Sequence, residues 1–486
     1  MIKQGLLSLK ICCFLCVLLP LSVFSQDDKL LREDLERLFQ SMRSAERKTL
    51  VENYVGALRG SFLSVQERER VTEVFAELRG LHMSADPDLK NYVKCVGAFY
   101  VRGEKANLLV WLGGLERLLN KGERKRSVLK NYLEDTVVAA CEKALLSSSS
   151  HKWLVRGDLL WQDGGNRISL AFDRSTLVCT TRKDSILIYE TTGHCLLGSD
   201  HLDGRGGTVR WPLAPDKMYA GLSAYRIDLK NSGYSADSVI FHYEGKYDYP
   251  IPGCLKDNAF KYVRNASDPY PEFSSYGKDI RIPALFDDLS FCGGINYAGM
   301  KFMGVGTDDN PAKIRIAPND TIAVSLTSTC FQIDTNRIVA GSTGIAIEMD
   351  SGEIVHPDVS LLYTVPNRTM IVKRISEQSL HLAFKDTYHQ ILFDMDEITW
   401  RLDSACMEMR MSSRSGLFKA TIESVSYFND DLYDKLQGLD EINPLNGLLK
   451  CSLALGSDVF TVSQYTAFLK KPADQLRKQI ILLSYA

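Results

Sequence analysis

The spacing of apolar residues changes once along this chain, near the tract SSSSHKW that begins at Ser147. Before the tract, apolar residues recur every three to four positions, as they do on one face of a helix. After it come short β-branched and aromatic runs divided by Gly, Asp, Asn and Pro, which are typical of strands. The change predicts a multidomain α+β protein, with an all-α domain over residues 26–149 and an all-β region over residues 150–425.

The helical domain is expected to consist of stacked helical hairpins. Ser64 with Glu67 has the capping-box pattern, and Asp86 with Pro87 predicts a cap followed by proline at the first helical position. The helices show no clean period that would define a repeat family. The segments with helical spacing are DDKLLREDLERLFQSM, SVQERERVTEVFAELRGL, LKNYVKCVGAFY, NLLVWLGGLERLL and SVLKNYLEDTVVAACEKALL.

The all-β region is too long and too evenly rich in strands for one small sandwich. We expect either a solenoid-like stack or tandem sandwiches, in one or two units. Glycines recur in SFCGGINYAGMKFMGVGTDD, where short strands would need sharp turns or bulges. Asp350, Ser351 and Gly352 predict a tight hairpin loop.

Residues 426–486 return to helical spacing. FTVSQYTAFLKK and PADQLRKQIILLSYA have the outline of a helix-turn-helix, or winged-helix-like, segment, for which a packing role is favoured. The chain closes on the apolar run IILLSYA, and two hypotheses account for it. Either the chain is truncated and lacks the partner of this helix, or the helix docks onto NPLNGLLKCSLALG.

The N-terminus has the features of a secretory signal peptide. Lys3 and Lys10 flank the start of an apolar run from Ile11 to Phe24, which predicts a signal peptide over residues 1–25 with cleavage after Ser25. The run is short for crossing about 30 Å of hydrocarbon, and no second such run follows. We therefore expect export to the periplasm or the outer-membrane or cell surface, without a transmembrane span after signal removal.

The charge balance and the spacing of the cysteines argue against nucleic-acid binding and against a metal site. The 58 basic and 60 acidic residues nearly cancel, which argues against nucleic acid as a partner. Beyond residue 25 the cysteines are widely spaced without a CxxC pair, and the histidines are scattered, so no metal site or cofactor is predicted. In an oxidising compartment, Cys179 and Cys195 form the candidate disulfide pair.

The string HLDGRGGTVRW contains the most site-like glycines. Gly204, Gly206 and Gly207 would present backbone N–H groups to an anion beside Arg205. A phosphate loop opens a helix, however, and this string runs into a strand. The favoured interpretation is a turn between strands, with Trp211 in the core.

Paired carboxylates would suit glycoside hydrolysis, which needs two acids across one scissile bond. None of the candidate pairs is favoured, because turns and solvated strand faces carry such acids routinely. GSTG at Gly341 lacks the GxSxG pattern of a nucleophile elbow, so the catalytic residues are unknown. The candidate acids are Asp287 with Asp288, Asp308 with Asp309, and Asp394, Asp396 and Glu397.

Tyrosines are concentrated in YEGKYDYPIPG and SDPYPEFSSYG. Exposed aromatic rings would bind sugars by stacking. Tyrosines next to proline more often pin loops to a core, and that role is favoured here.

Several strings together resemble a group of long, exported, uncharacterised proteins of the Bacteroidota. They are KDSILIYETTG, GRGGTVRW, YSADSVIFHY, FCGGINYAGMKFMGVGT and YDKLQGLDEINPL. The resemblance implies export and a helical domain followed by a β-rich body, and members of the group continue further at the C-terminus. Five Asp-Ser/Thr-apolar triplets resemble O-glycosylation acceptors of exported proteins in these bacteria. The triplets begin at Asp135, Asp184, Asp237, Asp320 and Asp403.

The function expected from these observations is an exported cell-envelope scaffold or protein-interaction module without catalytic activity. Its expected partners are other envelope proteins or a surface glycan, and not nucleic acid. The alternative hypothesis is a polysaccharide-binding or polysaccharide-degrading β-solenoid protein, which would need only scattered acids and aromatic residues.

Overall fold

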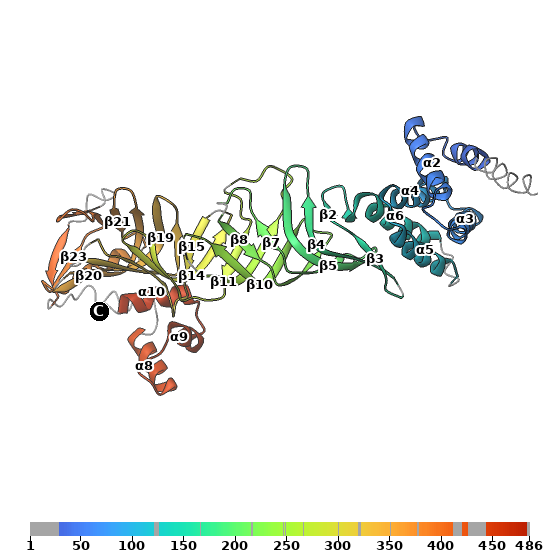
Figure 1. Ribbon diagram of the computed structural model, residues 1–486. Coiled ribbons are helices and arrows are strands. Elements are labelled where there is room, and N and C mark those ends of the chain that lie inside the picture. Colours follow the sequence, from blue (N-terminus) through green and yellow to red (C-terminus); the bar gives the residue numbers. More distant parts are fainter. Residues whose placement is uncertain are drawn as a thin grey trace, which may run out of the picture. The chain divides into compact units, whose positions relative to one another are not determined.

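The computed structural model has helices in the N-terminal region followed by a large antiparallel β-sheet body, which confirms the α+β class (Figure 1). The predicted signal peptide, residues 1–25, lies outside the described residues. The structure describes residues 29–483 except 121–125, 166, 215–216, 246, 248, 266, 300, 319–321, 350, 377–378, 412–419 and 426–443.

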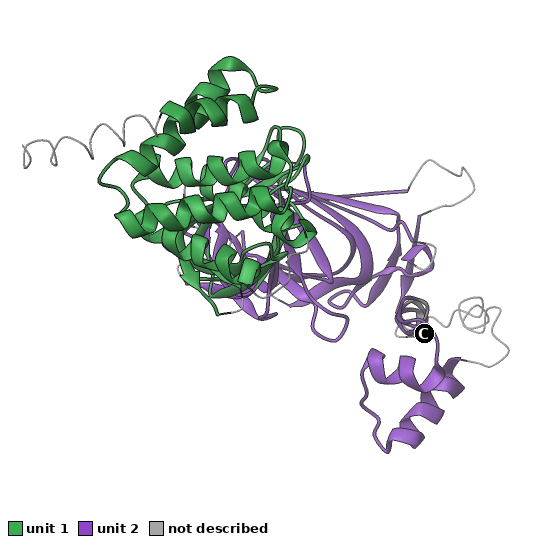
Figure 2. Ribbon diagram, turned by 90° about the vertical axis from the view of Figure 1, so that its right-hand side faces the viewer, with its two compact units in different colours: residues 1–209, 221–236, 257–264 green, residues 210–220, 237–256, 265–486 purple. Residues whose placement is uncertain are grey.

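The chain divides into two compact units, coloured separately in Figure 2. Unit 1 comprises residues 1–209, 221–236 and 257–264, and unit 2 comprises residues 210–220, 237–256 and 265–486. The helical region therefore belongs to the same unit as the first strands. Four strands contain a boundary between the units: β7 (Thr208–Arg210), β8 (Met218–Gly221), β10 (Gly233–Tyr243) and β11 (Ile251–Asn258).

The helices of unit 1 follow the predicted spacing, with one addition. The capping box at Ser64 is present, because the Ser64 hydroxyl accepts from the main-chain N–H of Glu67 while the Glu67 carboxylate accepts from that of Ser64. The helix over Ser44–Arg59 was not among the predicted segments. The helices are residues 29–38, α2 (Ser44–Arg59), α3 (Val65–Gly80), the π-helical turn η1 (Ala85–Leu89), α4 (Lys90–Arg102), α5 (Lys105–Asn120) and α6 (Arg126–Glu142).

Two predicted helix ends differ in part from the structure. Asp86 has an extended backbone and Pro87 follows it into the helix, as expected, but the capping hydrogen bond before this helix comes from Ser84. The Ser84 hydroxyl accepts from the main-chain N–H of Asp88, and Asp86 instead binds the Lys90 ammonium. The helix predicted to run through ALL ends at Glu142, because Lys143 adopts a positive φ of 49° and the next residues enter strand β1 (Ala144–Ser147). Pairing of β1 with β2 overrides the helical propensity of Ala-Leu-Leu.

The core of the helical region is aromatic. Trp111 is fully buried and packs against Tyr92 and Phe99, with ring centroids 5.4 and 5.9 Å away. The Trp111 indole N–H donates to the Thr136 hydroxyl at 3.0 Å, and the Tyr92 hydroxyl donates to the Val71 carbonyl at 2.8 Å. These bonds satisfy polar atoms that would be costly to bury alone.

The strands of unit 1 alternate buried and exposed side chains. β4 and β5 form the longest pair, and the ring of Phe172 on β4 lies against Gly193 on β5, where an added Cβ would be 2.5 Å from that ring. Glycine is needed at 193 to let the ring approach the strand. The strands are β1, β2 (Lys152–Arg156), β3 (Leu160–Asp163), β4 (Ile168–Thr180), β5 (Ser185–Leu196), β6 (His201–Arg205) and β9 (Ala224–Asp228).

Buried charge holds one long connection of unit 1. The Arg264 guanidinium lies 3.1 Å from Asp184 and 3.0 Å from Asp257, and all three side chains are at most 7% exposed. Arg264 also donates to the Asn258 carbonyl, and Asp184 accepts from the main-chain N–H of Phe260. The cluster ties residues 258–264 to the turn before β5, and the charges compensate each other away from water.

Unit 2 continues the antiparallel pairing to residue 424. Met349 pairs with Gly352, so the predicted hairpin is present, while Asp350 lies outside the described residues. The strands that lie wholly in unit 2 are β12 (Glu272–Ser275), β13 (Ile280–Phe286), β14 (Leu289–Ala298), β15 (Lys301–Val305), β16 (Ala312–Ile316), β17 (Ala323–Ser328), β18 (Cys330–Ile333), β19 (Arg337–Met349), β20 (Gly352–Thr364), β21 (Thr369–Lys373), β22 (Phe384–Asp386), β23 (Ile391–Asp394), β24 (Glu397–Arg401), β25 (Met407–Arg410) and β26 (Thr421–Ser424), with the 3-10 turn η2 (Ser379–His381).

Three helices end the described chain: α8 (Pro444–Leu455), α9 (Val462–Leu469) and α10 (Ala473–Leu483). They share a small core of Cys451, Tyr465 and Leu476, against which Ile480 packs. Thr461 and Gln464 form a capping box at the start of α9. The last helix therefore does pack onto α8, as one of the two hypotheses held.

Glycine-specific packing in unit 2 gives a test of this fold. An added Cβ at Gly304 would lie 2.3 Å from the ring of Phe291, which is buried, whereas nothing lies within 4 Å of one at Gly341. We expect Gly304→Ala to lower the free energy of unfolding by about 1–3 kcal/mol through overpacking. Gly341→Ala is the control and should change it by less than about 1 kcal/mol. Urea unfolding of both variants measures the difference, and equal effects would contradict the strand register.

Candidate functional site

The glycines of HLDGRGGTVRW form a turn, as favoured from the sequence. Gly206 and Gly207 adopt positive φ values of 67° and 105° between β6 and β7. The Gly206 N–H donates to the Ser223 carbonyl at 2.6 Å, and the Gly207 carbonyl accepts from Leu222 at 2.9 Å. These bonds engage the turn with the connection between β8 and β9 instead of arranging it around an anion, and the Arg205 side chain is exposed.

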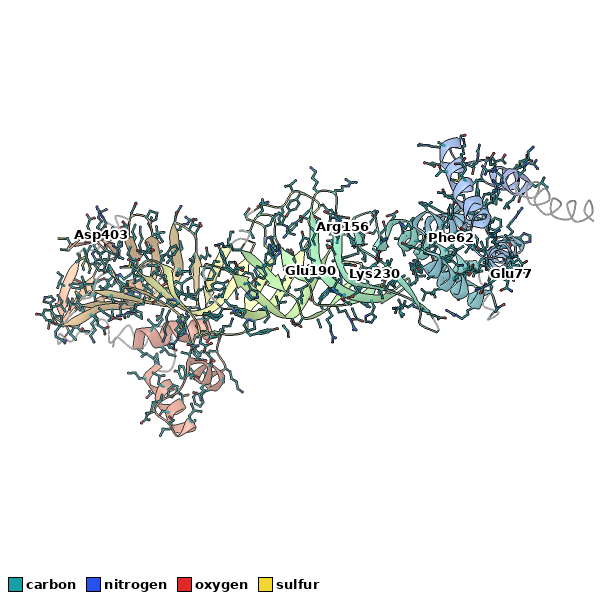
Figure 3. All side chains as sticks on the ribbon, in the orientation of Figure 1. Phe62, Glu77, Arg156, Glu190, Lys230 and Asp403 are labelled. Carbon is teal, nitrogen blue, oxygen red and sulfur yellow. The ribbon has the colours of Figure 1, made fainter. Side chains whose placement is uncertain are left out.

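Two of the acid pairs are engaged by arginines. Asp288 forms an ion pair with Arg368, which also lies 3.4 Å from Asp403. Asp403 is labelled in Figure 3. Asp308 lies 2.6 Å from Arg477 on α10. The neighbouring acids take no catalytic arrangement either: Asp287 is exposed in the β13–β14 turn, and Asp309 accepts from the Ser463 hydroxyl of α9 at 2.7 Å.

The third set of acids converges on one buried arginine. The Arg374 side chain is 2% exposed and lies 2.7 Å from Asp394 and 3.1 Å from Asp396. Its other terminal nitrogen donates to the Leu382 carbonyl at 2.6 Å. The third acid of the set, Glu397, forms a separate ion pair with Lys373, whose hydrogen bond lowers the pKa of Glu397.

A second polar group lies beside Arg374. His356 is 1% exposed; its Nε2 donates to the Leu382 carbonyl at 3.2 Å, and its Nδ1 accepts from the main-chain N–H of Asp358 at 3.1 Å. The Asp358 carboxylate accepts from the hydroxyls of Ser342, which belongs to GSTG, and of Ser376. Burial, together with the charge of Arg374, lowers the pKa of His356 to about 4.

We define the Arg374 cluster as Arg374, His356, Asp358, Asp394 and Asp396. It brings together two of the acids that the sequence analysis considered, Asp394 and Asp396. Asp394 and Asp396 both serve as acceptors for one guanidinium, whereas a hydrolytic pair flanks a scissile bond. Both ring nitrogens of His356 are occupied by the backbone, so the ring has no lone pair for proton transfer to a substrate. The cluster joins β20, β21 and the β23–β24 turn, and its chemistry is that of an ion-pair anchor.

Sequence reasoning missed Arg374, His356 and Asp358. Arg374 follows the apolar strand TMIVK, and a charged residue directly after a strand normally marks its exposed end. The alternation along the strand does indicate where this side chain lies. Residue 374 falls on the same strand face as Met370 and Val372, which are buried. Period-two alternation placed Arg374 on the inner face.

The tyrosine-rich segments pin loops to the body. Tyr247 is buried and its hydroxyl lies 3.4 Å from that of Tyr297. Tyr249 donates to the Arg281 carbonyl at 2.5 Å, and the Tyr276 hydroxyl accepts from the main-chain N–H of Ser238 at 2.9 Å. Each of these rings has its polar end engaged by the protein, which supports the loop-pinning interpretation of these segments.

The disulfide considered between Cys179 and Cys195 is wrong. Cys179 pairs with Ile186, whereas Cys195 pairs with Leu170, nine residues from Cys179 along the same strand. At about 3.3 Å per residue this separation is several times the reach of a disulfide. Both thiols are buried, and burial raises the pKa of each to about 12, so they act as small apolar groups.

One Asp-Thr triplet is closed to modification in the folded chain. Thr136 is fully buried and its hydroxyl is bonded to Trp111 and to the Tyr132 carbonyl. A sugar at this position would require the helical core to open.

A cleft of about 620 Å³ lies between α2 and α4. Leu50 and Val93 contribute an apolar floor, and Glu46, Lys90 and Lys94 contribute charged groups. The two helices run side by side in the same direction, because Gly97 faces Asn53 and Gly56 faces Tyr100. An added Cβ at Gly97 would lie 2.9 Å from that of Asn53, so glycine permits the close approach that closes one end of the cleft.

Neither a spanning helix nor a metal cluster is found where the structure describes the chain. None of the described helices is both long and apolar enough to cross a membrane. The described His, Cys, Asp and Glu residues form no group of three that would hold a metal ion. Of the basic sequence KGERKR at residues 121–126, only Arg126 is described, and it donates to the Leu81 carbonyl.

Comparison with family models, curated proteins and solved structures finds no match to this chain.

Removing the central arginine tests the anchor role. Arg374→Met should lower the free energy of unfolding by about 3–5 kcal/mol, because it leaves the largely buried Asp396 without its compensating charge. The added change Asp396→Asn should recover part of the loss, as measured by urea unfolding. Arg401→Met removes an exposed arginine and serves as the control. Full stability of Arg374→Met would show that the cluster is not an anchor.

The depressed pKa of His356 predicts a pH dependence of stability. A histidine with a pKa of about 4 when folded and 6.5 when unfolded binds fewer protons in the native state between these values. Its contribution is complete above pH 6.5 and is lost as the pH falls toward 4, by about 2 kcal/mol between pH 7 and pH 5. Urea unfolding at both values should show this loss in the wild type and in the exposed-site control His381→Gln. The loss should be absent from His356→Gln, and its persistence there would assign it to another group.

Proposed function

We propose that this protein is an exported, non-catalytic module of the cell envelope that binds other envelope proteins. The observation that carries the proposal is the cleft between α2 and α4. Its apolar floor and charged rim have the character of grooves that accept an amphipathic helix, where apolar anchors enter the floor and charges pair at the rim. Asp288, Asp308 and Asp394 of unit 2, in contrast, are each engaged by an arginine.

Export is part of the proposal and rests on the sequence. The apolar run from Ile11 to Phe24, with Lys3 and Lys10 before it, is the supporting feature. We place the protein in the periplasm or at the outer-membrane or cell surface.

The finer architecture belongs to the same proposal. We propose that the β region is of solenoid-like or tandem-sandwich type. We also propose that α9 and α10 form a helix-turn-helix-like packing module. The contacts of Ser463 with Asp309 and of Arg477 with Asp308 support a packing role, since they engage these helices with the β15–β16 loop.

A glycan-binding role is the second candidate. The ring of Tyr262 is about half exposed and stacks on Phe260 at 4.9 Å, while the Arg264 guanidinium lies over Phe260 at 5.4 Å. A rigid, exposed ring of this kind suits stacking against a sugar face. The hydroxyls of Tyr247, Tyr249 and Tyr276 in the two tyrosine-rich segments, in contrast, are bonded within the protein.

Filling the cleft tests the protein-binding proposal. Thr49 lines the cleft and is exposed, so Thr49→Trp should occupy the groove without disturbing the core. Lys48→Trp places the same ring on the neighbouring exposed position of α2 outside the cleft residues. We expect a partner cross-linked to the wild type in native envelopes to be retained by Lys48→Trp and lost by at least about tenfold in Thr49→Trp, which corresponds to about 1.4 kcal/mol.

Three results would contradict the proposal. Equal capture by both tryptophan variants would place the interaction elsewhere. Loss of capture on glycosidase treatment of the envelope would favour the glycan candidate. Turnover of a polysaccharide by the purified protein would exclude a non-catalytic role.

A further inference from the structure

Helix α8 carries an apolar row on the side away from its own core. Leu445, Leu449 and Leu453 follow one another at four-residue spacing, which places them on one helix face. They are 46%, 58% and 73% exposed. The opposite face supplies Leu448 and Cys451 to the small core of the three helices. The leucine row therefore lies outside that core.

A basic residue flanks the leucine row on one side and an acidic residue on the other. Lys450 directly follows Leu449, and helical geometry places it on one side of the row and Ser452 on the other. The Ser452 hydroxyl donates to the Asp458 carboxylate at 2.7 Å, which holds this acid on the Ser452 side. Both Lys450 and Asp458 are exposed. The row thus has a positive border and a negative border, and the two charges cancel.

The cleft between α2 and α4 has walls of the complementary charges. Glu46 lines it from α2 and Lys94 lines it from α4, and both side chains are exposed. Lys90, the other basic residue of the cleft, is already paired with Asp86 at 2.9 Å. The apolar floor of the cleft therefore lies between a negative wall, which Glu46 provides, and a positive wall, which Lys94 provides.

The cleft and the leucine row also agree in length. At about 1.5 Å per residue, the row from Leu445 to Leu453 extends over about 12 Å. The residues of α2 that line the cleft run from Ala45 to Asn53, which is also about 12 Å. Gly97 lines the opposite wall and has no side chain there, which leaves room for the leucines of an incoming helix.

We propose that the cleft of one copy of this chain binds the leucine row of a second copy. The inference rests on the proposed role of the cleft as a groove for an amphipathic helix. In the complex the leucines lie on the cleft floor, and Lys450 faces Glu46 across one border. Asp458 then faces Lys94 across the other. Reversing α8 in the cleft would bring like charges together, so the two ion pairs select one direction of the helix.

A second copy is the partner that the chain itself specifies, because the two complementary surfaces belong to one sequence. Both are exposed in the single chain, as Thr49 of the cleft and the three leucines of α8 show. A contact between two different surfaces leaves one cleft and one row free in each pair, so further copies can add. One helix face covers less than the roughly 800 Å² per partner of a stable interface, and we therefore expect association at about 10–100 μM.

Sedimentation velocity tests the proposal with the chain from Gln26 onward, which lacks the apolar run Ile11–Phe24 that would itself cause association. The mean mass of the wild type should rise with concentration. Thr49→Trp fills the cleft and keeps the leucine row, whereas the double change Leu449→Asp and Leu453→Asp removes the row and keeps the cleft. Each variant alone should be monomeric. Their equimolar mixture should form dimers and grow no further, because each supplies the surface that the other lacks.

Exchange of the charges tests the direction of α8 in the cleft. Glu46→Lys and Lys450→Glu should each weaken self-association by about fivefold, because each replaces an attraction by a repulsion. Both changes in one chain should restore most of the loss, since opposite charges again face each other between copies. Loss without this rescue would contradict the proposed pairing.

Controls keep loss of folding apart from loss of association. Thr49 and both leucines are exposed, so their variants should retain the far-ultraviolet circular dichroism and the unfolding midpoint of the wild type. Lys48→Trp and Val101→Asp change exposed residues outside both surfaces and should associate like the wild type.

The outcomes also separate this inference from the proposed function. A wild type that stays monomeric at about 100 μM, or a mixture of the two variants that stays monomeric, would overturn self-association. Undiminished association of Thr49→Trp would assign the leucine row to a second α8 and overturn it as well. A monomeric wild type whose envelope partner is lost in Thr49→Trp would refute the inference and leave the proposed function standing. Self-association without capture of any other envelope protein would do the reverse.

Discussion

Antiparallel backbone pairing is the interaction on which the β region depends. In the described chain most strands pair with a neighbour close in sequence, as β19 does with β20 through the turn after Met349. Such pairing fixes which side chains face inward, because a shift of one residue would turn every buried side chain outward. Glycines at 193 and 304 belong to this constraint, since each leaves room for a phenylalanine ring beside the strand. The positions of all other groups follow from the register.

Buried arginines fix connections between strands in both units. In unit 1 Arg264 binds two aspartates and a carbonyl, and in unit 2 Arg374 does the same. In both clusters the guanidinium joins a connection between strands to the strands themselves. A planar group with five donors can satisfy carboxylates and carbonyls at once, which a lysine cannot do. Charge that would be unfavourable in a core thus fixes these connections, because each guanidinium is compensated by carboxylates.

The sequence allowed the class of most elements to be predicted, because helical and strand periodicity depend on nearby residues. The capping box at Ser64 is a local motif and was predicted for the same reason. The exceptions are positions where pairing with another segment determines the secondary structure. The residues after Lys143 pair with β2 and leave the helix for this reason. The candidate acids were recognised, but their arginines were not. Arg477 is 169 residues from Asp308 in sequence, and periodicity states which face a side chain occupies without naming its neighbour.

Surface features therefore say more about function than the candidate acids of unit 2 do. Among the described residues, the core of α8–α10 contains three buried residues and four partly buried ones, so each additional leucine would strengthen it appreciably. Three leucines of α8 nevertheless face outward in a regular row. An isolated exposed leucine is ordinary, but a row on one face is a contiguous apolar patch, and such patches mark contact surfaces.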